Sequence, residues 1–289
     1  MRLSPFRLHR PTTVEQATEL LKELGADALP YCGGTELLLV AKLGLTDFTD
    51  LVDLKGIDEL SGIEANGALR IGATTTHREL ERSPLIRSRW PSLAAMERHV
   101  GNIRVRNVGT IGGNLCFADP HSDPATYLIA AAGSLTVRGL QGTREIPAEE
   151  FTRGPYETAL APSELLVSVQ IPALSAGSAL VHRKLAFHER PAITVAVNVT
   201  FTDGAVASAR VAVGSVGVRA QRLTQTERSL HGLNAVAPDG EALRATADTA
   251  AQEAEPVEDA NGSVEYKRQL VRVVVTRCIR DALAEAGPA

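Results

Sequence analysis

V-G-N-I-R-V-R-N-V-G-T-I-G-G-N-L-C-F-A-D-P-H-S-D, residues Val100 to Asp123, is the stretch from which the fold of this chain can be inferred. Its glycines and small polar residues are Gly101, Gly109, Thr110, Gly112, Gly113 and Asn114. Glycine has no Cβ, so it reaches positive φ and lets a ligand touch the main chain. The Gly112-Gly113 pair therefore predicts a turn whose backbone N–H groups point at one anion, as in phosphate-binding nests. A plain turn between two strands is the alternative.

A second glycine pair strengthens the anion-binding interpretation. Cys32-Gly33-Gly34-Thr35-Glu36 follows the apolar run Ala28–Tyr31 and precedes four apolar residues, 37–40. No Gly-Lys-Ser/Thr follows either pair, and the spacing differs from G-x-G-x-x-G, so a P-loop and the dinucleotide fingerprint are both excluded. Two such loops, each at the end of a short strand, are suited to gripping the two phosphates of one dinucleotide.

The two motifs together resemble a known family. C-G-G-T-E followed by Leu37, and T-I-G-G-N followed by Ser122-Asp123, are similar to the FAD-binding medium subunits of molybdenum hydroxylases. These are the carbon monoxide dehydrogenase medium subunit and the FAD domain of xanthine dehydrogenase, and the resemblance covers nearly the whole chain. It implies the FAD-binding fold of the vanillyl-alcohol oxidase type.

The expected fold class is α+β, with two α/β FAD-binding lobes followed by an antiparallel sheet plus helices. We expect an N-terminal lobe at 1–55, a second lobe at 56–175 and a C-terminal domain at 176–289, divided by a loop rich in Ala, Ser and Gly. Thr13–Leu24 predicts a capped helix that ends at Gly25. In the predicted helix Ser263–Ala286, one apolar stripe predicts core packing. The stripe is Val271, Val274, Val275, Cys278 and Ala282.

The resemblance implies a set of FAD-binding residues. They are Tyr31, Cys32, Gly33, Gly34, Thr35, Glu36, Leu37, Val100, Gly101, Gly109, Thr110, Ile111, Gly112, Gly113, Asn114, Cys116, Asp123, Val167 and Lys184.

Three of these residues have alternative interpretations. The family aspartate that Asp123 matches contacts the ribityl side of the flavin, whereas locally Asp123 could be a helix N-cap before Pro124. Lys184 matches a family lysine near the flavin ring, where a cation stabilises the reduced flavin; the alternative is a solvated strand lysine. Glu36 could cap the following helix instead of touching FAD. After Lys184 the match weakens, because Phe187–Pro191 fills the place where relatives carry an arginine.

Other classes of site find no support in the sequence. The three cysteines match no metal spacing, and the scattered histidines have no triad pattern, so we expect neither a bound metal nor a catalytic residue. Aromatic content of 4% and a net charge of −4 argue against a nucleic-acid surface. No apolar run approaches the ~20 residues that span a bilayer, and Met1–Arg10 does not resemble a signal peptide. We therefore expect a cytoplasmic protein.

The resemblance implies an oxidoreductase subunit that transfers electrons through FAD. Its expected partners are a large molybdenum-cofactor subunit and a small subunit with [2Fe–2S] clusters, in a dimer of heterotrimers that serves an external electron acceptor. A stand-alone flavin oxidase or dehydrogenase is one alternative, and a scaffold subunit without FAD is another.

Overall fold

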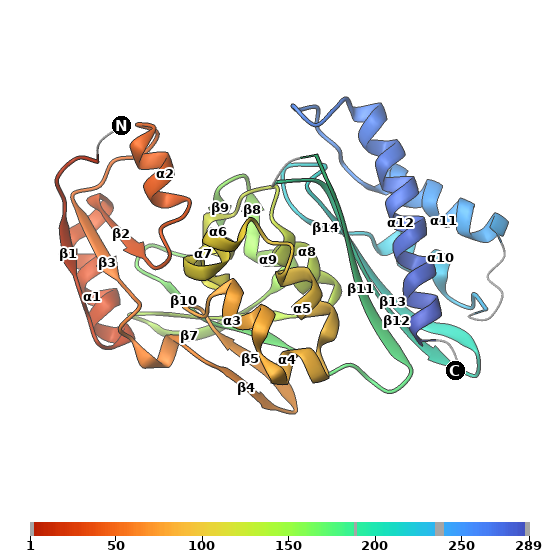
Figure 1. Cartoon of the computed structure of the whole chain (residues 1–289), viewed down its shortest axis with the longest axis horizontal. Coiled ribbons are helices and arrows are strands. Elements are labelled where there is room, and N and C mark those ends of the chain that lie inside the picture. Colours follow the sequence, from red (N-terminus) through yellow and green to blue (C-terminus); the bar gives the residue numbers. More distant parts are fainter. Residues whose placement is uncertain (1–2, 188–189, 235–239, 287–289) are drawn as a thin grey trace.

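The computed structural model describes residues 3–187, 190–234 and 240–286. Three sheets follow one another along the long axis of the molecule (Figure 1). The red and orange N-terminal lobe lies at one end, and the blue C-terminal helices lie at the other.

The N-terminal sheet is parallel, in the order β1-β3-β2. Its elements are β1 (Arg7–His9), α1 (Val14–Leu24), β2 (Ala28–Tyr31), α2 (Leu37–Lys42) and β3 (Asp50–Asp53). The predicted helix α1 is confirmed: the side chain of its N-cap, Thr13, accepts a hydrogen bond from the Gln16 N–H, and Gly25 ends it at φ +71. The capping box is incomplete, because Gln16 Oε1 accepts from Thr12 instead.

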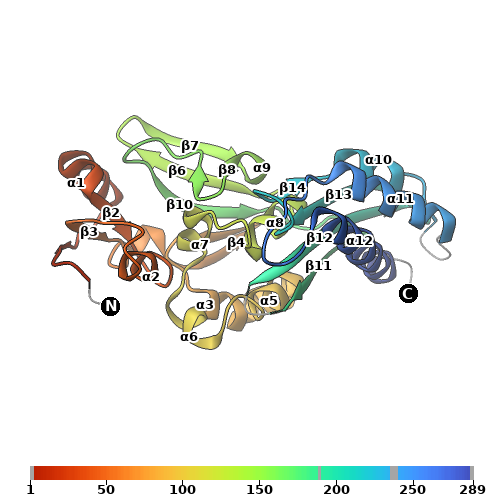
Figure 2. The same ribbon diagram turned by 90° about the horizontal axis from the view of Figure 1, so that it is seen from above.

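The central sheet is antiparallel, in the order β4-β5-β10-β6-β7. Its strands are β4 (Ile63–Asn66), β5 (Ala68–Gly72), β6 (Ser134–Gly139), β7 (Gly142–Pro147) and β10 (Leu165–Ile171). The helices of this lobe are α3 (His77–Arg82), α4 (Pro84–Arg89), α5 (Pro91–Glu97), α6 (Ile103–Val108), α7 (Ile111–Phe117), α8 (Asp123–Ala130) and α9 (Ala148–Phe151). A short hairpin of β8 (Thr152–Gly154) and β9 (Glu157–Thr158) follows. Figure 2 shows α3, α5 and α6 on one side of this sheet.

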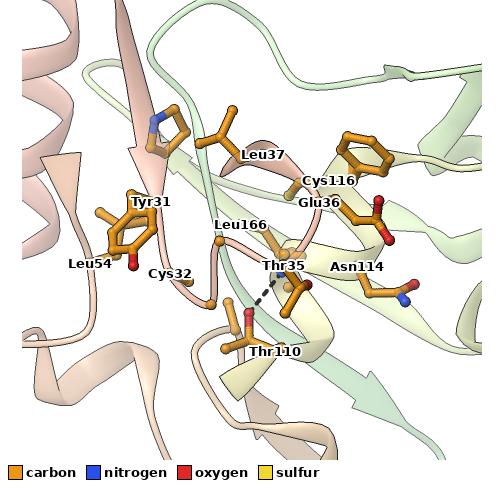
Figure 3. Close-up of a pocket in the computed structure, with 18 of the residues that line it drawn as sticks. Tyr31, Cys32, Thr35, Glu36, Leu37, Leu54, Thr110, Asn114, Cys116 and Leu166 are labelled. Atoms are coloured by element: carbon orange, nitrogen blue, oxygen red, sulfur yellow. Dashed lines mark hydrogen bonds between the residues drawn. The ribbon is translucent and has the colours of Figure 1, made fainter. Parts of the chain in front are cut away.

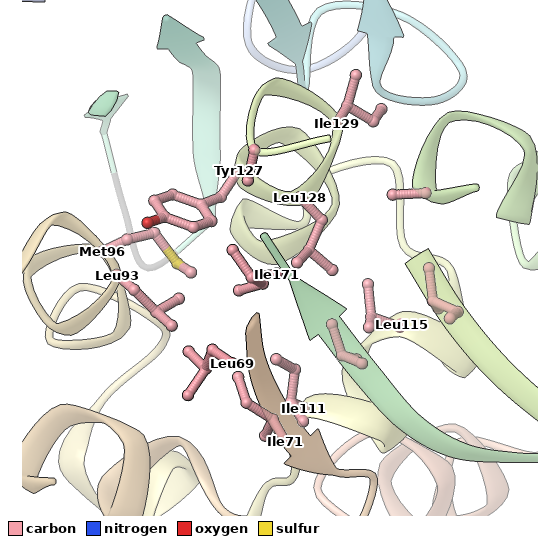
Figure 4. Packing of buried hydrophobic residues seen from close by; sticks show 14 of the residues in the cluster. Leu69, Ile71, Leu93, Met96, Ile111, Leu115, Tyr127, Leu128, Ile129 and Ile171 are labelled. Atoms are coloured by element: carbon pink, nitrogen blue, oxygen red, sulfur yellow. The ribbon is translucent and has the colours of Figure 1, made fainter. Parts of the chain in front are cut away.

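One apolar core joins the central sheet to its helices. Figure 4 shows Leu69 and Ile71 of β5 and Ile171 of β10 in one cluster with Leu93, Ile111 and Leu115. Every one of these side chains is buried. Burial of this kind contributes roughly 1.5–3 kcal/mol per side chain, so the core fixes the position of the helices that carry the second glycine motif.

The second glycine motif is helical, and the predicted positive-φ turn is wrong. Gly112 and Gly113 lie in the first turn of α7, where Thr110 is the N-cap and neither glycine has positive φ. The motif also follows helix α6 and not a strand. A Cβ on Gly112 would lie 2.6 Å from the Ala73 carbonyl oxygen, so glycine is needed there for close packing.

The C-terminal sheet is antiparallel, in the order β11-β12-β13-β14. Its elements are β11 (Ser178–Ala186), β12 (Pro191–Thr202), β13 (Ala205–Gly214), β14 (Gln221–Arg222), α10 (Thr224–Leu230), α11 (Gly240–Glu253) and α12 (Val264–Ala286). The predicted apolar stripe of α12 is confirmed, because all five of its residues are buried against this sheet. A hydrogen bond of 2.8 Å between the Thr126 and Thr194 hydroxyls joins α8 to β12. The domain limits at residues 55 and 175 stay a prediction.

Candidate functional site

A cavity of about 290 Å³ lies between the N-terminal and central lobes. That volume is at the lower end of the range for ligand pockets, roughly 300–1,000 Å³. Its wall includes the loop after β2, Leu54 after β3, the first turns of α7 and the start of β10. Figure 3 shows Tyr31, Leu54 and Leu166 around the space that Thr35 and Thr110 face.

The first glycine loop presents free hydrogen-bond donors to this cavity. Within the described residues, the backbone N–H groups of Gly33, Gly34, Thr35 and Glu36 have no acceptor. Gly34 has φ +67, and a Cβ there would lie 2.6 Å from the Tyr31 ring. A row of free amides on a turn that contains positive φ is therefore suited to an anion.

The second glycine motif has its amides bonded inside the protein. The bonds are Ile111 N to Thr75 O (3.0 Å), Gly112 N to Ala73 O (2.9 Å), Gly113 N to Thr110 Oγ1 (3.0 Å) and Asn114 N to Thr110 O (2.9 Å). The expectation that Gly112-Gly113 forms a nest of free donors is therefore wrong. Its glycines instead give the cavity a wall without side chains.

The two motifs touch each other at Gly33. A Cβ on Gly33 would lie 2.2 Å from the Val108 carbonyl oxygen and 2.8 Å from Gly109 Cα. No side chain larger than hydrogen fits there without moving backbone. The two motifs, which the sequence predicted to act together on one dinucleotide, are thus in direct backbone contact.

Two carboxylates stand at the cavity and each has an arginine partner. Arg144 bonds Glu164 at 2.7 Å, and this bond holds the pKa of Glu164 below its usual range. Burial raises the pKa of Glu36, although Arg190 opposes the shift. Arg190 bonds both Glu36 and Asp119, so it links the first loop to the segment after α7. Glu36 occupies the N-cap position of α2, as the capping alternative expected, but its side chain makes no capping hydrogen bond there.

Cys32 and Cys116 line the cavity as free thiols. Burial raises the pKa of each thiol to about 12. The thiolate is the reactive form of cysteine, so both residues serve as small apolar wall groups at neutral pH.

Asp123 and Lys184 form an ion pair outside the cavity wall. Lys184 Nζ lies 2.7 Å from Asp123 Oδ2 and also donates to the His99 carbonyl oxygen at 2.9 Å. Burial raises the pKa of Asp123 to about 6, and Lys184 opposes this shift. The N-cap of α8 is Ser122, so the capping alternative for Asp123 is wrong, as is the solvated alternative for Lys184.

The cavity wall brings together most of the predicted binding residues. Those in the wall are Tyr31, Cys32, Gly33, Gly34, Thr35, Glu36, Leu37, Gly109, Thr110, Gly112, Gly113, Asn114 and Cys116. Those outside it are Val100, Gly101, Ile111, Asp123, Val167 and Lys184. Val100, Ile111 and Val167 are core side chains. The roles of all these residues in binding remain predictions.

The sequence did not indicate several residues of the wall. They are Leu29, Pro30, Leu54, Ala73, His77, Val105, Phe117, Leu160, Glu164, Leu165 and Leu166. The apolar strand that contains Leu165 and Leu166 was visible in the sequence, but its position beside the first loop was not. His77 carried no local signal, because its partner Glu97 lies on another helix.

Two kinds of feature are absent from the described residues. No group of three or more His, Cys, Asp or Glu residues there could hold a metal ion. No helix in the same part of the chain is long and apolar enough to cross a membrane.

Comparison with known proteins assigns the two parts of the chain to matching families. Residues 4–174 match the family described as the FAD binding domain in molybdopterin dehydrogenase. Residues 186–282 match the CO dehydrogenase flavoprotein C-terminal domain. The chain is therefore a flavoprotein subunit of an oxidoreductase.

Individual relatives match this chain along nearly their full length. The chain is 33% identical to the carbon monoxide dehydrogenase medium chain of Hydrogenophaga pseudoflava, over 98% of both chains. It is 30% identical to the nicotine 6-hydroxylase medium subunit of Paenarthrobacter nicotinovorans, over 98% of this chain and 99% of that one. The solved carbon monoxide dehydrogenase of Hydrogenophaga pseudoflava superposes with a TM-score of 0.94, at 33% identity and full coverage of both chains. Quinoline 2-oxidoreductase of Pseudomonas putida 86 gives 0.91 at 27% identity, with 99% of each chain covered.

This chain belongs to the FAD-binding medium subunits of molybdenum hydroxylases of the carbon monoxide dehydrogenase and xanthine dehydrogenase type. In this family the medium subunit binds FAD, and other subunits carry the molybdenum and iron–sulfur centres. The predicted family, fold class and cofactor are confirmed.

Proposed function

We propose that this chain is the electron-transfer subunit of a molybdenum hydroxylase complex. It receives electrons that originate at the molybdenum centre and pass through [2Fe–2S] clusters of a partner, and it delivers them to an external acceptor. Bound FAD supplies redox chemistry in one-electron and two-electron steps. The organic or inorganic substrate is oxidised by the large subunit.

The observation that supports this function is the row of free amides from Gly33 to Glu36, which faces a wall of the glycine motif 109–113. The chain's own residues bind and orient the cofactor. The free amides suit the diphosphate, and Leu29, Leu54 and Leu166 offer an apolar surface for a ring. No group in the wall resembles a catalytic triad or a metal centre within the described residues.

The proposed partners follow from the relatives, which are medium chains of complexes that also contain large and small subunits. We propose a small [2Fe–2S] subunit, a large molybdenum subunit and a cytoplasmic dimer of heterotrimers. A closed two-fold arrangement is the commonest symmetry among soluble oligomers.

A visible spectrum of the purified chain tests the flavin assignment, because a bound flavin makes the protein yellow. Acid precipitation should release the whole of the flavin, since FAD is held without a covalent bond. A colourless chain that does not take up added FAD would refute this assignment.

A pull-down from the native host under mild salt tests the assembly. Iron and molybdenum should appear in the eluate with a small and a much larger partner. The chain alone should bind FAD and oxidise no substrate of the complex. A yellow monomer that contains neither metal and oxidises a substrate by itself would contradict the proposed subunit role. It would favour a stand-alone oxidase.

A further inference from the structure

A fully buried pair of ionisable side chains lies beneath the cavity. The pair is His77, at the start of α3, and Glu97, at the end of α5. A hydrogen bond of 2.6 Å connects Nδ1 of His77 with Oε2 of Glu97. Their side chains are only 2% and 0% exposed. The main chain holds His77 in place as well, since its N–H donates to the Gly109 carbonyl oxygen at 3.0 Å. Burying an ionisable pair this deeply costs desolvation free energy.

The other edge of the His77 ring faces the cavity. His77 is part of the cavity wall, and its Cδ2 lies 3.5 Å from the point where a Cβ on Gly109 would stand. Thr35 Oγ1, on the first loop, is also 3.5 Å from that point. Nε2, which is bonded to Cδ2, makes no hydrogen bond to any described residue. The ring edge that carries this unused nitrogen thus belongs to the cavity wall, beside Gly109 and Thr35.

The cavity wall otherwise lacks a positive charge. In the described part of the chain, the wall contains no lysine and no arginine, and its charged members are Glu36 and Glu164. The diphosphate of FAD carries two negative charges, which a cofactor held in this cavity would bring to the wall. His77 is the one side chain of the described wall that is able to carry a compensating charge.

The charged groups around the pair leave His77 as the only described partner of the Glu97 side chain. Asp123 and Lys184 lie in the same buried region and are ion-paired with each other at 2.7 Å. His182 is neutral, because burial lowers its pKa to about 3. The Lys184 charge is thus used by Asp123, and the only described hydrogen-bond partner of the Glu97 side chain is His77. Glu97 Oε1 has no hydrogen-bond partner among the described residues, so no other donor neutralises this carboxylate.

We propose that His77 is the cationic contact for the FAD diphosphate and that Glu97 is its buried counter-ion. The inference rests on the proposed function, because it assumes that FAD occupies this cavity. Glu97 acts through His77, so it is a positioning residue. The free amides of the first loop supply hydrogen bonds to the same anion, and His77 adds charge.

The test compares the affinities of FAD, ADP and adenosine for the full-length chain and its variants. His77→Gln removes the charge and keeps a polar side chain of similar size. Glu97→Gln keeps the bond to Nδ1 but removes the counter-ion. His182→Gln is the control, since the His182 side chain is also only 5% exposed but lies outside the cavity wall.

The expected result is a loss specific to the diphosphate. His77→Gln should bind FAD and ADP about 10- to 100-fold more weakly, the size expected for one charge-assisted hydrogen bond. Adenosine binding should change by less than about threefold, since it has no phosphate. Glu97→Gln should shift in the same direction, and the two changes should not add, because they remove one interaction. His182→Gln should bind all three ligands as the wild type does.

Two results would overturn the inference. Wild-type ADP affinity in a folded His77→Gln chain would show that His77 is no anchor. Equal losses for ADP and adenosine would show a purely structural role. Should the variants fail to fold, nitrogen-15 spectra of the wild-type histidines decide, because the His77 ring should carry both protons when ADP is bound, and a neutral ring would refute the proposal. If the wild-type chain binds no FAD, the proposed function fails first.

Discussion

Gly33→Ala is the substitution for which the structure gives the sharpest expectation. The new Cβ would lie 2.2 Å from the Val108 carbonyl oxygen, whereas ordinary contacts begin at 3.4 Å. The atoms that the new Cβ would meet belong to the backbone of Val108 and Gly109, so no side-chain rotation can make room for it. The two glycine motifs would have to separate by about 1 Å, and overpacking of this kind costs roughly 1–3 kcal/mol.

The assay is thermal unfolding followed by circular dichroism, together with flavin content by absorbance. A loss of about 1–3 kcal/mol should lower the melting temperature by roughly 2–10 °C. FAD affinity should fall at least tenfold, because the free amides of the first loop move relative to the opposite wall. Gly56→Ala is the control, since its Cβ would meet nothing nearer than 4.0 Å and its φ is not positive. A Gly33→Ala chain with unchanged melting temperature and full flavin content would refute the reasoning.

Three further predictions concern buried charge and thiols. Lys184→Met should destabilise the chain by about 3–5 kcal/mol, because the buried Asp123 carboxylate loses its partner; chemical denaturation measures this, and a change below about 1 kcal/mol would contradict it. The folded pKa of Asp123, raised by burial to about 6 from 3.8, means that the folded state binds more protons between those values, so this residue's contribution to stability falls as pH rises from about 4 to 6. Asp123→Asn should remove that pH dependence from the unfolding curve, and an unaltered slope would count against the assignment. Cys32 and Cys116 should react slowly with iodoacetamide at pH 8, since burial raises both pKa values to about 12, and rapid labelling in the folded protein would show that the thiols are accessible.

Local signals in the sequence predicted the elements that depend on near neighbours. The limits of helix α1 were predictable because both are set by local contacts. Its N-cap Thr13 accepts a hydrogen bond from the Gln16 N–H, and the N–H of its C-cap Gly25 donates to the Leu21 carbonyl oxygen. The apolar stripe of α12 followed from the helical period. The first glycine loop is a donor-rich turn because its conformation depends mainly on Gly34.

Long-range packing decided the features that were predicted wrongly or missed. Thr110 caps the helix of Gly112 and Gly113 locally, but the Gly112 amide is bonded by the Ala73 carbonyl oxygen, which belongs to a distant segment. Asp123 paired with Lys184, which the chain brings from another sheet. Neither outcome can be derived from residue spacing.

The sequence by itself determined the family, the α+β class, the FAD cofactor and the two motifs that face each other, because each glycine pair sits in a short and specific context. Only the tertiary structure decided which motif offers free amides and which side chains complete the cavity wall. It also decided that His77 is hydrogen-bonded to Glu97. The physical reason is that hydrogen-bond satisfaction and charge compensation depend on atoms brought together from separate strands and helices, and those atoms lie far apart in the sequence.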